Sequence, residues 1–169
     1  FDTETKMTRV LLALFAVFLT ATLTQAEPSK SATVADKNGC KVYNPMPQEN
    51  ESISWDGDCL GGFADGKGTL NWYINGELRE HYSGEMRGGW AEGNGIFTSR
   101  DGTQYDGEWL KSKQNGRGVQ INANGSAYDG EWVDGKPHGR GRYRAPNGQI
   151  WEGEWRHGEP LDDADGRRI

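Results

Sequence analysis

The sequence has few cysteines, few aliphatic side chains and no long apolar run. Its longest apolar stretch, Val10–Leu19, is ten residues, whereas a membrane-spanning helix needs about 20. Glycine is abundant, with 25 residues among 169, so an ordinary two-layer core is not expected and a solenoid-like sheet suits the composition better. Positive charge is also scarce. The formal net charge of −6 argues against a nucleic-acid partner.

No arrangement typical of catalysis or metal binding is present. The three histidines are far apart in the sequence, and the spacing of Cys40 and Cys59 excludes a Cys-x-x-Cys site. The stretch Gly61–Lys67 imitates a phosphate-binding loop, but Gly68 stands where that loop requires Ser or Thr. We therefore predict no enzyme activity, no cofactor and no metal.

The segment from Met7 to Ala26 has the pattern of a secretory signal peptide. Arg9 precedes the apolar run, and the small-residue site Thr24-Gln25-Ala26 follows it. We expect cleavage before Glu27, with an uncleaved anchor as the alternative, and residues 1–6 to lie upstream of the natural start. The predicted location is outside the cytoplasm: exported, periplasmic or secreted, and possibly peripheral to the membrane.

Aromatic residues recur at a fixed period through the rest of the chain. Tyr82, Tyr105, Tyr128 and Trp151 follow one another at intervals of 23 residues, and Trp55 precedes Tyr82 by 27, which is one period plus a four-residue insertion. Glycines keep constant offsets from these rings, at Gly57/Gly66/Gly68, Gly84/Gly93/Gly95, Gly107/Gly116/Gly118 and Gly130/Gly139/Gly141. Such self-similarity indicates a repeat array.

This skeleton resembles the MORN (membrane occupation and recognition nexus) repeat, whose pattern is close to Y-x-G-E-W-x-x-G-K-x-H-G-x-G. The third full copy carries every motif position, as Tyr128, Gly130, Glu131, Trp132, Gly135, Lys136, His138, Gly139 and Gly141. The resemblance implies an all-β fold, an elongated single-layer antiparallel meander of hairpins with no second domain. It also implies membrane association or protein assembly.

We expect the chain to consist of four segments. They are a signal peptide (7–26), an N-terminal leader and cap (27–52), an array of four repeats plus a partial fifth (53–160) and a charged tail (161–169). In the Tyr128 copy, alternation places Tyr128 and Trp132 on one face of a first strand, Tyr128–Trp132. Val133–His138 is expected as the loop, with the second strand starting near Gly139.

The two cysteines are expected to form a disulfide, because an isolated pair in an exported chain is most simply oxidised. Cys59 takes the position that Trp109 and Trp132 hold in later copies. It should therefore lie on the aromatic face, where Cys40 would bring the segment 38–43 over the first repeat as a cap. Two free thiols are the alternative.

Most of the repeated rings are expected to be core, because rings lying across neighbouring glycines replace a second layer. The last copy has no following repeat to cover it. Its rings Trp151 and Trp155, with Tyr143 beside them, are therefore the predicted partner-binding residues.

Charged residues form columns on the opposite face. Glu85, Glu108, Glu131 and Glu154 recur in one column, and Lys67, Arg117 and Arg140 in another. We interpret them as a register-fixing ladder, with paired catalytic carboxylates as the weaker alternative. A basic stripe is the candidate anion-binding patch, made of Lys136, His138, Arg140, Arg142 and Arg144.

The predicted function is a non-catalytic binding or scaffolding module for protein–protein or membrane-associated assembly. A protein partner is favoured over a phospholipid surface, because acidic chains are not attracted to anionic leaflets. The alternative is a glycan or cell-wall binding module that uses the aromatic face.

Overall fold

The computed structural model describes residues 32–44 and 46–161. The predicted signal peptide, the first part of the leader and residues 162–169 of the tail lie outside this range. Within it the chain forms strands and no helix. The strands are β1 (Ala32–Ala35), β2 (Lys41–Asn44), β3 (Glu51–Trp55), β4 (Asp58–Leu60), β5 (Phe63–Ile74), β6 (Glu77–Arg87), β7 (Trp90–Ser99), β8 (Gln104–Leu110), β9 (Lys113–Ile121), β10 (Ala127–Val133), β11 (Lys136–Arg144), β12 (Ile150–Arg156) and β13 (Glu159–Pro160).

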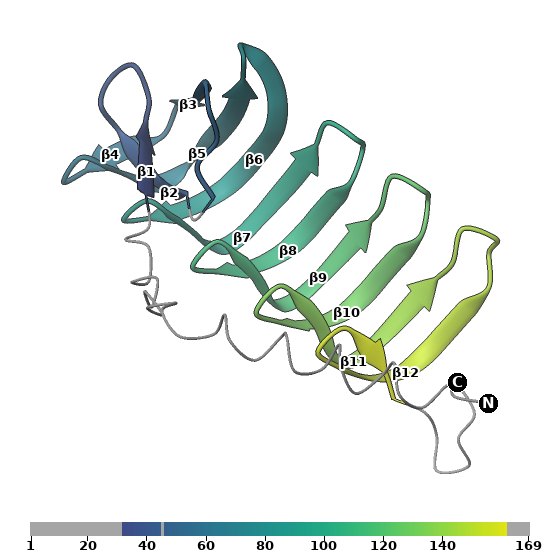
Figure 1. The fold of residues 1–169 in the computed structure, drawn as a ribbon. Coiled ribbons are helices and arrows are strands. Elements are labelled where there is room, and N and C mark those ends of the chain that lie inside the picture. The colour runs from purple at the N-terminus through teal and green to yellow at the C-terminus, as the bar shows by residue number, and fades with distance from the viewer. Residues whose placement is uncertain (1–31, 45, 162–169) are drawn as a thin grey trace, which may run out of the picture. The chain divides into compact units, whose positions relative to one another are not determined.

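All thirteen strands belong to one open sheet. From β5 to β13 each strand pairs antiparallel with the next in chain order, so the hairpins stack side by side (Figure 1). The predicted all-β meander is therefore confirmed. One link departs from it, because β2 pairs with β5 in parallel through Lys41 and Phe63.

Two kinds of turn alternate along the array. Asp101-Gly102, Asn124-Gly125 and Asn147-Gly148 turn the chain at one end of the hairpins, and each of these glycines has a positive φ. At the other end are two-residue turns such as Asp134-Gly135, with φ of 51° and 79°, as in a type I′ hairpin. The loop expected at Val133–His138 is therefore wrong. The tight turn lets β11 begin at Lys136.

A β-bulge follows the first glycine in the β6–β7, β8–β9 and β10–β11 hairpins. In the Tyr128 copy, Gly130 pairs with Gly141, but Glu131 already pairs with His138, so Gly139 and Arg140 have no partner on β10. Gly139 has a φ of 59°, the left-handed conformation that glycine adopts without a steric penalty. Gly93 and Gly116 hold the same place with φ of 65° and 79°. This repeated glycine is thus required by backbone geometry.

The other repeated glycines make room for the tyrosine rings. A Cβ on Gly130 would lie 2.7 Å from the Tyr128 hydroxyl and 2.6 Å from the Gly141 Cα. The ring crosses the glycine pair, and its hydroxyl donates a hydrogen bond to the Glu131 carbonyl oxygen at 3.1 Å. Tyr82 and Tyr105 do the same toward Glu85 and Glu108, at 2.9 and 3.0 Å.

Tryptophans fill the space between successive tyrosines. Trp132 contacts both Tyr105 and Tyr128 edge-on, with ring centroids 5.2 and 5.1 Å apart. Trp155 packs on Tyr128 in the same way, at 5.1 Å, and only 9% of it is exposed. The expectation that Trp155 is an uncovered terminal ring is wrong, because each tryptophan is covered by the preceding repeat.

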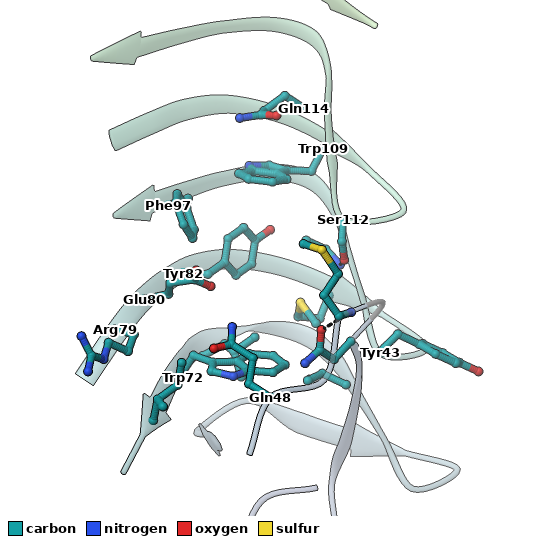
Figure 2. A pocket seen from close by; sticks show the side chains of 18 residues that line it. Tyr43, Gln48, Trp72, Arg79, Glu80, Tyr82, Phe97, Trp109, Ser112 and Gln114 are labelled. Atoms are coloured by element: carbon teal, nitrogen blue, oxygen red, sulfur yellow. Dashed lines mark hydrogen bonds between the residues drawn. The ribbon is translucent and has the colours of Figure 1, made fainter. Parts of the chain in front are cut away.

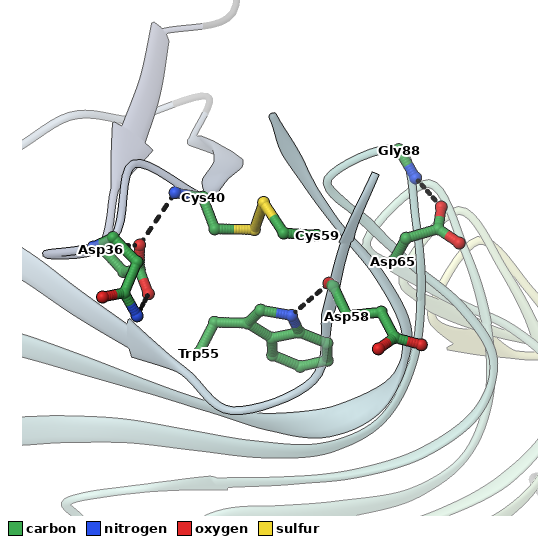
Figure 3. Close-up of a disulfide and its surroundings, with 8 residues drawn as sticks. Asp36, Cys40, Trp55, Asp58, Cys59, Asp65 and Gly88 are labelled. Carbon is green, nitrogen blue, oxygen red and sulfur yellow. Dashed lines mark hydrogen bonds between the residues drawn. A yellow bond between two sulfur atoms is a disulfide. The ribbon is translucent and has the colours of Figure 1, made fainter. Parts of the chain in front are cut away.

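The copy that begins at Trp55 is a repeat whose first strand is broken. β3 and β4 both pair with β5, and the Trp55 ring lies over Gly57 and Gly68 as Tyr128 lies over Gly130 and Gly141. Its indole Nε1 donates to the Asp58 carbonyl oxygen at 2.7 Å (Figure 3). The aromatic-over-glycine packing therefore begins at this copy.

A disulfide joins the N-terminal hairpin to this first copy. Cys40, just before β2, is bonded to Cys59 on β4, and their Cα atoms are 5.8 Å apart (Figure 3). Cys40 and Val42 are 2% and 1% exposed and pack in one cluster with Trp55, Ala64 and Met86. Cys59 itself is exposed. The β1–β2 hairpin thus covers the N-terminal end of the core.

Candidate functional site

The aromatic side chains leave two hollows on their face of the sheet. The C-terminal hollow has a volume of about 470 Å³ and is lined by Tyr128, Trp132, Tyr143, Trp151 and Trp155, with Gln120, Asn122 and small residues of the turns. All three predicted partner-binding rings, Tyr143, Trp151 and Trp155, therefore line one hollow. None of the described residues that line it is charged.

The three rings differ in depth. Trp155 belongs to the core, and its Nε1 points to the Gly141 carbonyl oxygen at 3.4 Å. Tyr143 and Trp151 are half-buried and face each other across β11 and β12, with centroids 5.6 Å apart and planes 31° apart. Tyr143 and Trp151 are register partners. The accessible aromatic surface in this hollow therefore comes from these two rings.

The N-terminal hollow, of about 380 Å³, was not predicted. Its apolar lining includes Leu70, Trp72, Tyr82, Phe97 and Trp109. Its polar and flexible lining includes Met46 and Gln48 from the segment after β2, and Asn44, Arg79, Glu80 and Gln114 from the strands. Figure 2 shows Trp72, Tyr82, Phe97, Trp109 and Gln114 on successive strands, with Gln48 reaching the hollow from a loop. The sequence feature that could have predicted this hollow is the four-residue insertion between Trp55 and Tyr82. It lengthens β5 and β6 to 12 and 11 residues, so that Trp72, Arg79 and Glu80 extend beyond the length of the later hairpins.

Two charged residues border the N-terminal hollow, and they are consecutive in the sequence. Burial raises the pKa of Glu80 above its ordinary value. Arg79 forms an ion pair with Glu77 at 3.2 Å and points away from the other side chains in Figure 2. Their formal charges cancel, so the described lining of the N-terminal hollow carries no net formal charge.

The glutamate column on the other face has a structural role. A Glu108 carboxylate oxygen accepts the Arg117 backbone N–H at 2.8 Å, and Glu131 accepts the Arg140 backbone N–H at 3.2 Å. These are N–H groups beside the bulges, which would otherwise lack a strand partner. The Glu108 and Glu131 carboxylates are thus engaged by the same contact in successive repeats.

The predicted basic stripe lies on β11 and is partly neutralised. Arg140 and Arg142 form cross-strand ion pairs with Glu154 and Glu152, at 3.1 and 3.0 Å. Lys136 and Arg144 are exposed, whereas His138 is half-buried, and its ring lies 5.5 Å from that of His157. Anion binding by these five residues stays a prediction.

The geometry of the described part of the chain shows neither a metal site nor a membrane-spanning helix. Among residues 32–44 and 46–161, no group of three or more His, Cys, Asp or Glu side chains is placed to hold a metal ion. The same residues contain no helix long and apolar enough to span a bilayer.

Comparison with known families supports the period read from the sequence. The family model of the MORN repeat matches residues 82–104, 105–127, 128–150 and 151–160. These boundaries coincide with the aromatic positions Tyr82, Tyr105, Tyr128 and Trp151. The Trp55 copy lies outside the match, although its ring packs on glycines in the same way. No curated protein matches the chain.

Proposed function

Because residues 82–160 belong to the MORN repeat family, whose members are generally binding or scaffolding modules, we propose that this chain is a non-catalytic module that holds a protein partner in its C-terminal hollow. Tyr143 and Trp151 are the anchors. The observation that carries this proposal is that these two rings remain accessible in a hollow of about 470 Å³, while the equivalent core rings are covered. Accessible aromatic side chains in uncharged hollows are frequent binding anchors.

MORN repeats in general bind proteins or membrane lipids, and two features favour the protein here. Arg140 and Arg142 are already paired with carboxylates, and the chain carries a net charge of −6, which anionic lipids repel. Among residues 32–44 and 46–161, those that line the C-terminal hollow include aromatic rings and no lysine or arginine, which a lipid headgroup would need.

We also place this module outside the cytoplasm. The signal-like segment 7–26 and the Cys40–Cys59 disulfide both support export, because disulfides persist in oxidising compartments. A fusion of the first 30 residues to a reporter that is active only outside the cytoplasm tests this. Reporter activity without that segment would contradict it.

The binding site is tested by affinity capture from envelope extract with wild-type chain, Trp151→Ala and Tyr143→Ala. Leu110→Ala is the matched control, because Leu110 is a large exposed apolar side chain on the opposite face of its strand from Trp109. We expect both hollow variants to lose a protein that wild type and Leu110→Ala retain. Equal capture by all four chains would contradict the proposal that the C-terminal hollow binds the partner.

A further inference from the structure

We propose that the N-terminal hollow is a second binding site, for a short neutral oligosaccharide. It shares no lining residue with the C-terminal hollow among the described residues, and its parts belong to the N-terminal end of the array. They come from the segment after β2, from the extended β5–β6 hairpin and from the first two repeats of the matched array.

The first argument is the exposure of the rings. Trp109 holds the position of Trp132 and Trp155 in its repeat, but those two are 3% and 9% exposed and Trp109 stays half-buried at the hollow. Its orientation is fixed, since Nε1 donates to the Gly95 carbonyl oxygen at 2.9 Å and its ring meets Tyr82 and Tyr105 edge-on. Trp72 offers a second half-buried indole in the same hollow. Flat indole faces of this kind are platforms for the C–H faces of sugar rings.

The second argument is the type of polar group around these rings. Gln48 and Gln114 are amides, which both donate and accept hydrogen bonds, as a sugar hydroxyl does. Gln114 Nε2 donates to Gln120 Oε1 at 3.3 Å, and Gln120 Nε2 donates to Asn122 Oδ1 at 2.7 Å. The Gln114 amide is therefore held in place from one side, while its Oε1 and second N–H remain for a ligand. A proline-rich peptide would present carbonyl acceptors but fewer N–H donors, because proline has none, and would match the amide oxygens less well than sugar hydroxyls.

The third argument is charge. Of the described residues that line the hollow, Arg79 and Glu80 alone are charged, and their formal charges cancel. A phosphorylated or carboxylated ligand would meet the carboxyl group of Glu80. The Arg79 guanidinium is already paired with Glu77 through one terminal nitrogen, and its buried Nε, which has no hydrogen-bond partner among the described residues, can donate to a neutral hydroxyl, so the hollow suits an uncharged sugar. Glu80, raised in pKa by burial, can offer its carboxyl group to hydroxyls.

The test is titration of the full chain with three neutral probes, cellotetraose, maltotetraose and chitotetraose, followed by tryptophan fluorescence. We expect one of them to bind. Trp72→Ala and Gln48→Ala should each weaken that binding roughly tenfold or more, whereas Trp151→Ala, in the other hollow, should leave it unchanged. Gln48 is exposed in a loop, so its loss should leave the melting temperature as it is even if Trp72→Ala unfolds.

Three outcomes would overturn the proposal. One is the absence of binding by all three probes at millimolar concentration. Another is undiminished binding by the folded Gln48→Ala chain. The third is binding of a proline-rich peptide, in place of the sugars, that depends on Trp72. Protein capture through Trp151 is measured separately, so either proposal can fail alone.

Discussion

The indole nitrogen of Trp132 donates a hydrogen bond to the Gly118 carbonyl oxygen, 3.0 Å away on β9. The same bond occurs between Trp109 and Gly95 and between Trp155 and Gly141, always over 14 residues. Each tryptophan is thereby tied to the preceding repeat, and its buried N–H is satisfied. The array is held together by one aromatic–glycine unit used repeatedly, as in other solenoids whose repeats contact only their neighbours.

Replacing a tryptophan of this column should therefore destabilise the sheet wherever it lies. We expect Trp132→Ala and Trp155→Ala each to lower the free energy of unfolding by about 3 kcal/mol or more. Trp151→Ala should cost about 1 kcal/mol or less, because its ring is half-buried at the hollow. Chemical denaturation of the three variants measures this. A loss at Trp155 as small as that at Trp151 would show that Trp155 is not part of the core.

The glycines beneath the tyrosines allow a matched comparison. Gly130 and Gly153 occupy the same place in consecutive repeats, but a Cβ on Gly130 would meet Tyr128 and the β11 backbone within 2.7 Å, while a Cβ on Gly153 would meet nothing within 4 Å. Gly130→Ala should cost about 1–3 kcal/mol through overpacking. Gly153→Ala should change stability by about 0.5 kcal/mol or less. Equal melting temperatures for the two variants would contradict the ring-over-glycine packing.

The tyrosine hydroxyls make the fold sensitive to alkali. Burial, with Glu131 nearby, raises the pKa of Tyr128 to about 12. Burial also raises the pKa values of Tyr82 and Tyr105, each with a nearby glutamate adding to the effect. In unfolded chain these phenols ionise near pH 10, so between pH 10 and 12 the folded state binds more protons than the unfolded state. Stability should then fall as pH rises through this range.

Denaturation midpoints measured at a series of alkaline pH values, with tyrosinate absorbance recorded in parallel, give the slope. Tyr128→Phe is the control, since it keeps the ring and removes the titrating hydroxyl. Its stability should be lower at neutral pH, where the bond to Glu131 is lost, but should depend less on pH above 10. A slope identical to that of wild type would show that Tyr128 does not titrate with folding.

The sequence was sufficient for the repeats because their packing is local and periodic. Aromatic residues such as Tyr128, paired glycines such as Gly130 and Gly141, and turn dipeptides such as Asn124-Gly125 each point to one local geometry. Their spacing of 23 residues fixes how the copies stack. The ring-over-glycine core followed from these features alone.

The bulge and the tight turns could not be read in the same way. The Lys111-Ser112 turn has φ of 49° at Lys111 and 59° at Ser112. Other copies have a glycine at the second of these positions. Ser112 is held in this conformation by two hydrogen bonds to Ala91. Its backbone N–H donates to the Ala91 carbonyl oxygen, and its Oγ accepts the Ala91 backbone N–H, both at 3.0 Å. Such compensation depends on a neighbouring strand.

The candidate site was predicted in part. Alternation along the strands placed Tyr143, Trp151 and Trp155 on one face, and they line one hollow. Their relative depth depended on whether a tryptophan is covered by the repeat before it or after it, which sequence spacing leaves undetermined. The N-terminal hollow combines Gln48, Trp72 and Trp109 from three separate segments, and only the tertiary arrangement brings them together.

The disulfide leads to a last prediction, about the cap. Cys40 is buried against Trp55 and Met86, whereas Cys59 is exposed, so a reductant can reach the bond from the Cys59 side. The bond closes a loop with a sequence separation of 19, and its loss should lower the free energy of unfolding by about 3 kcal/mol in the loop-entropy description.

Because Cys40, Val42 and Ala64 belong to the N-terminal core cluster and Tyr128 and Trp132 to the other, we expect the cap to open before the C-terminal repeats. Hydrogen exchange of Cys59→Ser should therefore rise in β1, β2 and β4 while β10 and β11 stay protected. Mass spectrometry of the wild type should show neither thiol alkylated without reductant. Alkylation of both cysteines in unreduced protein, or unchanged exchange in the cap of Cys59→Ser, would contradict this role of the bond.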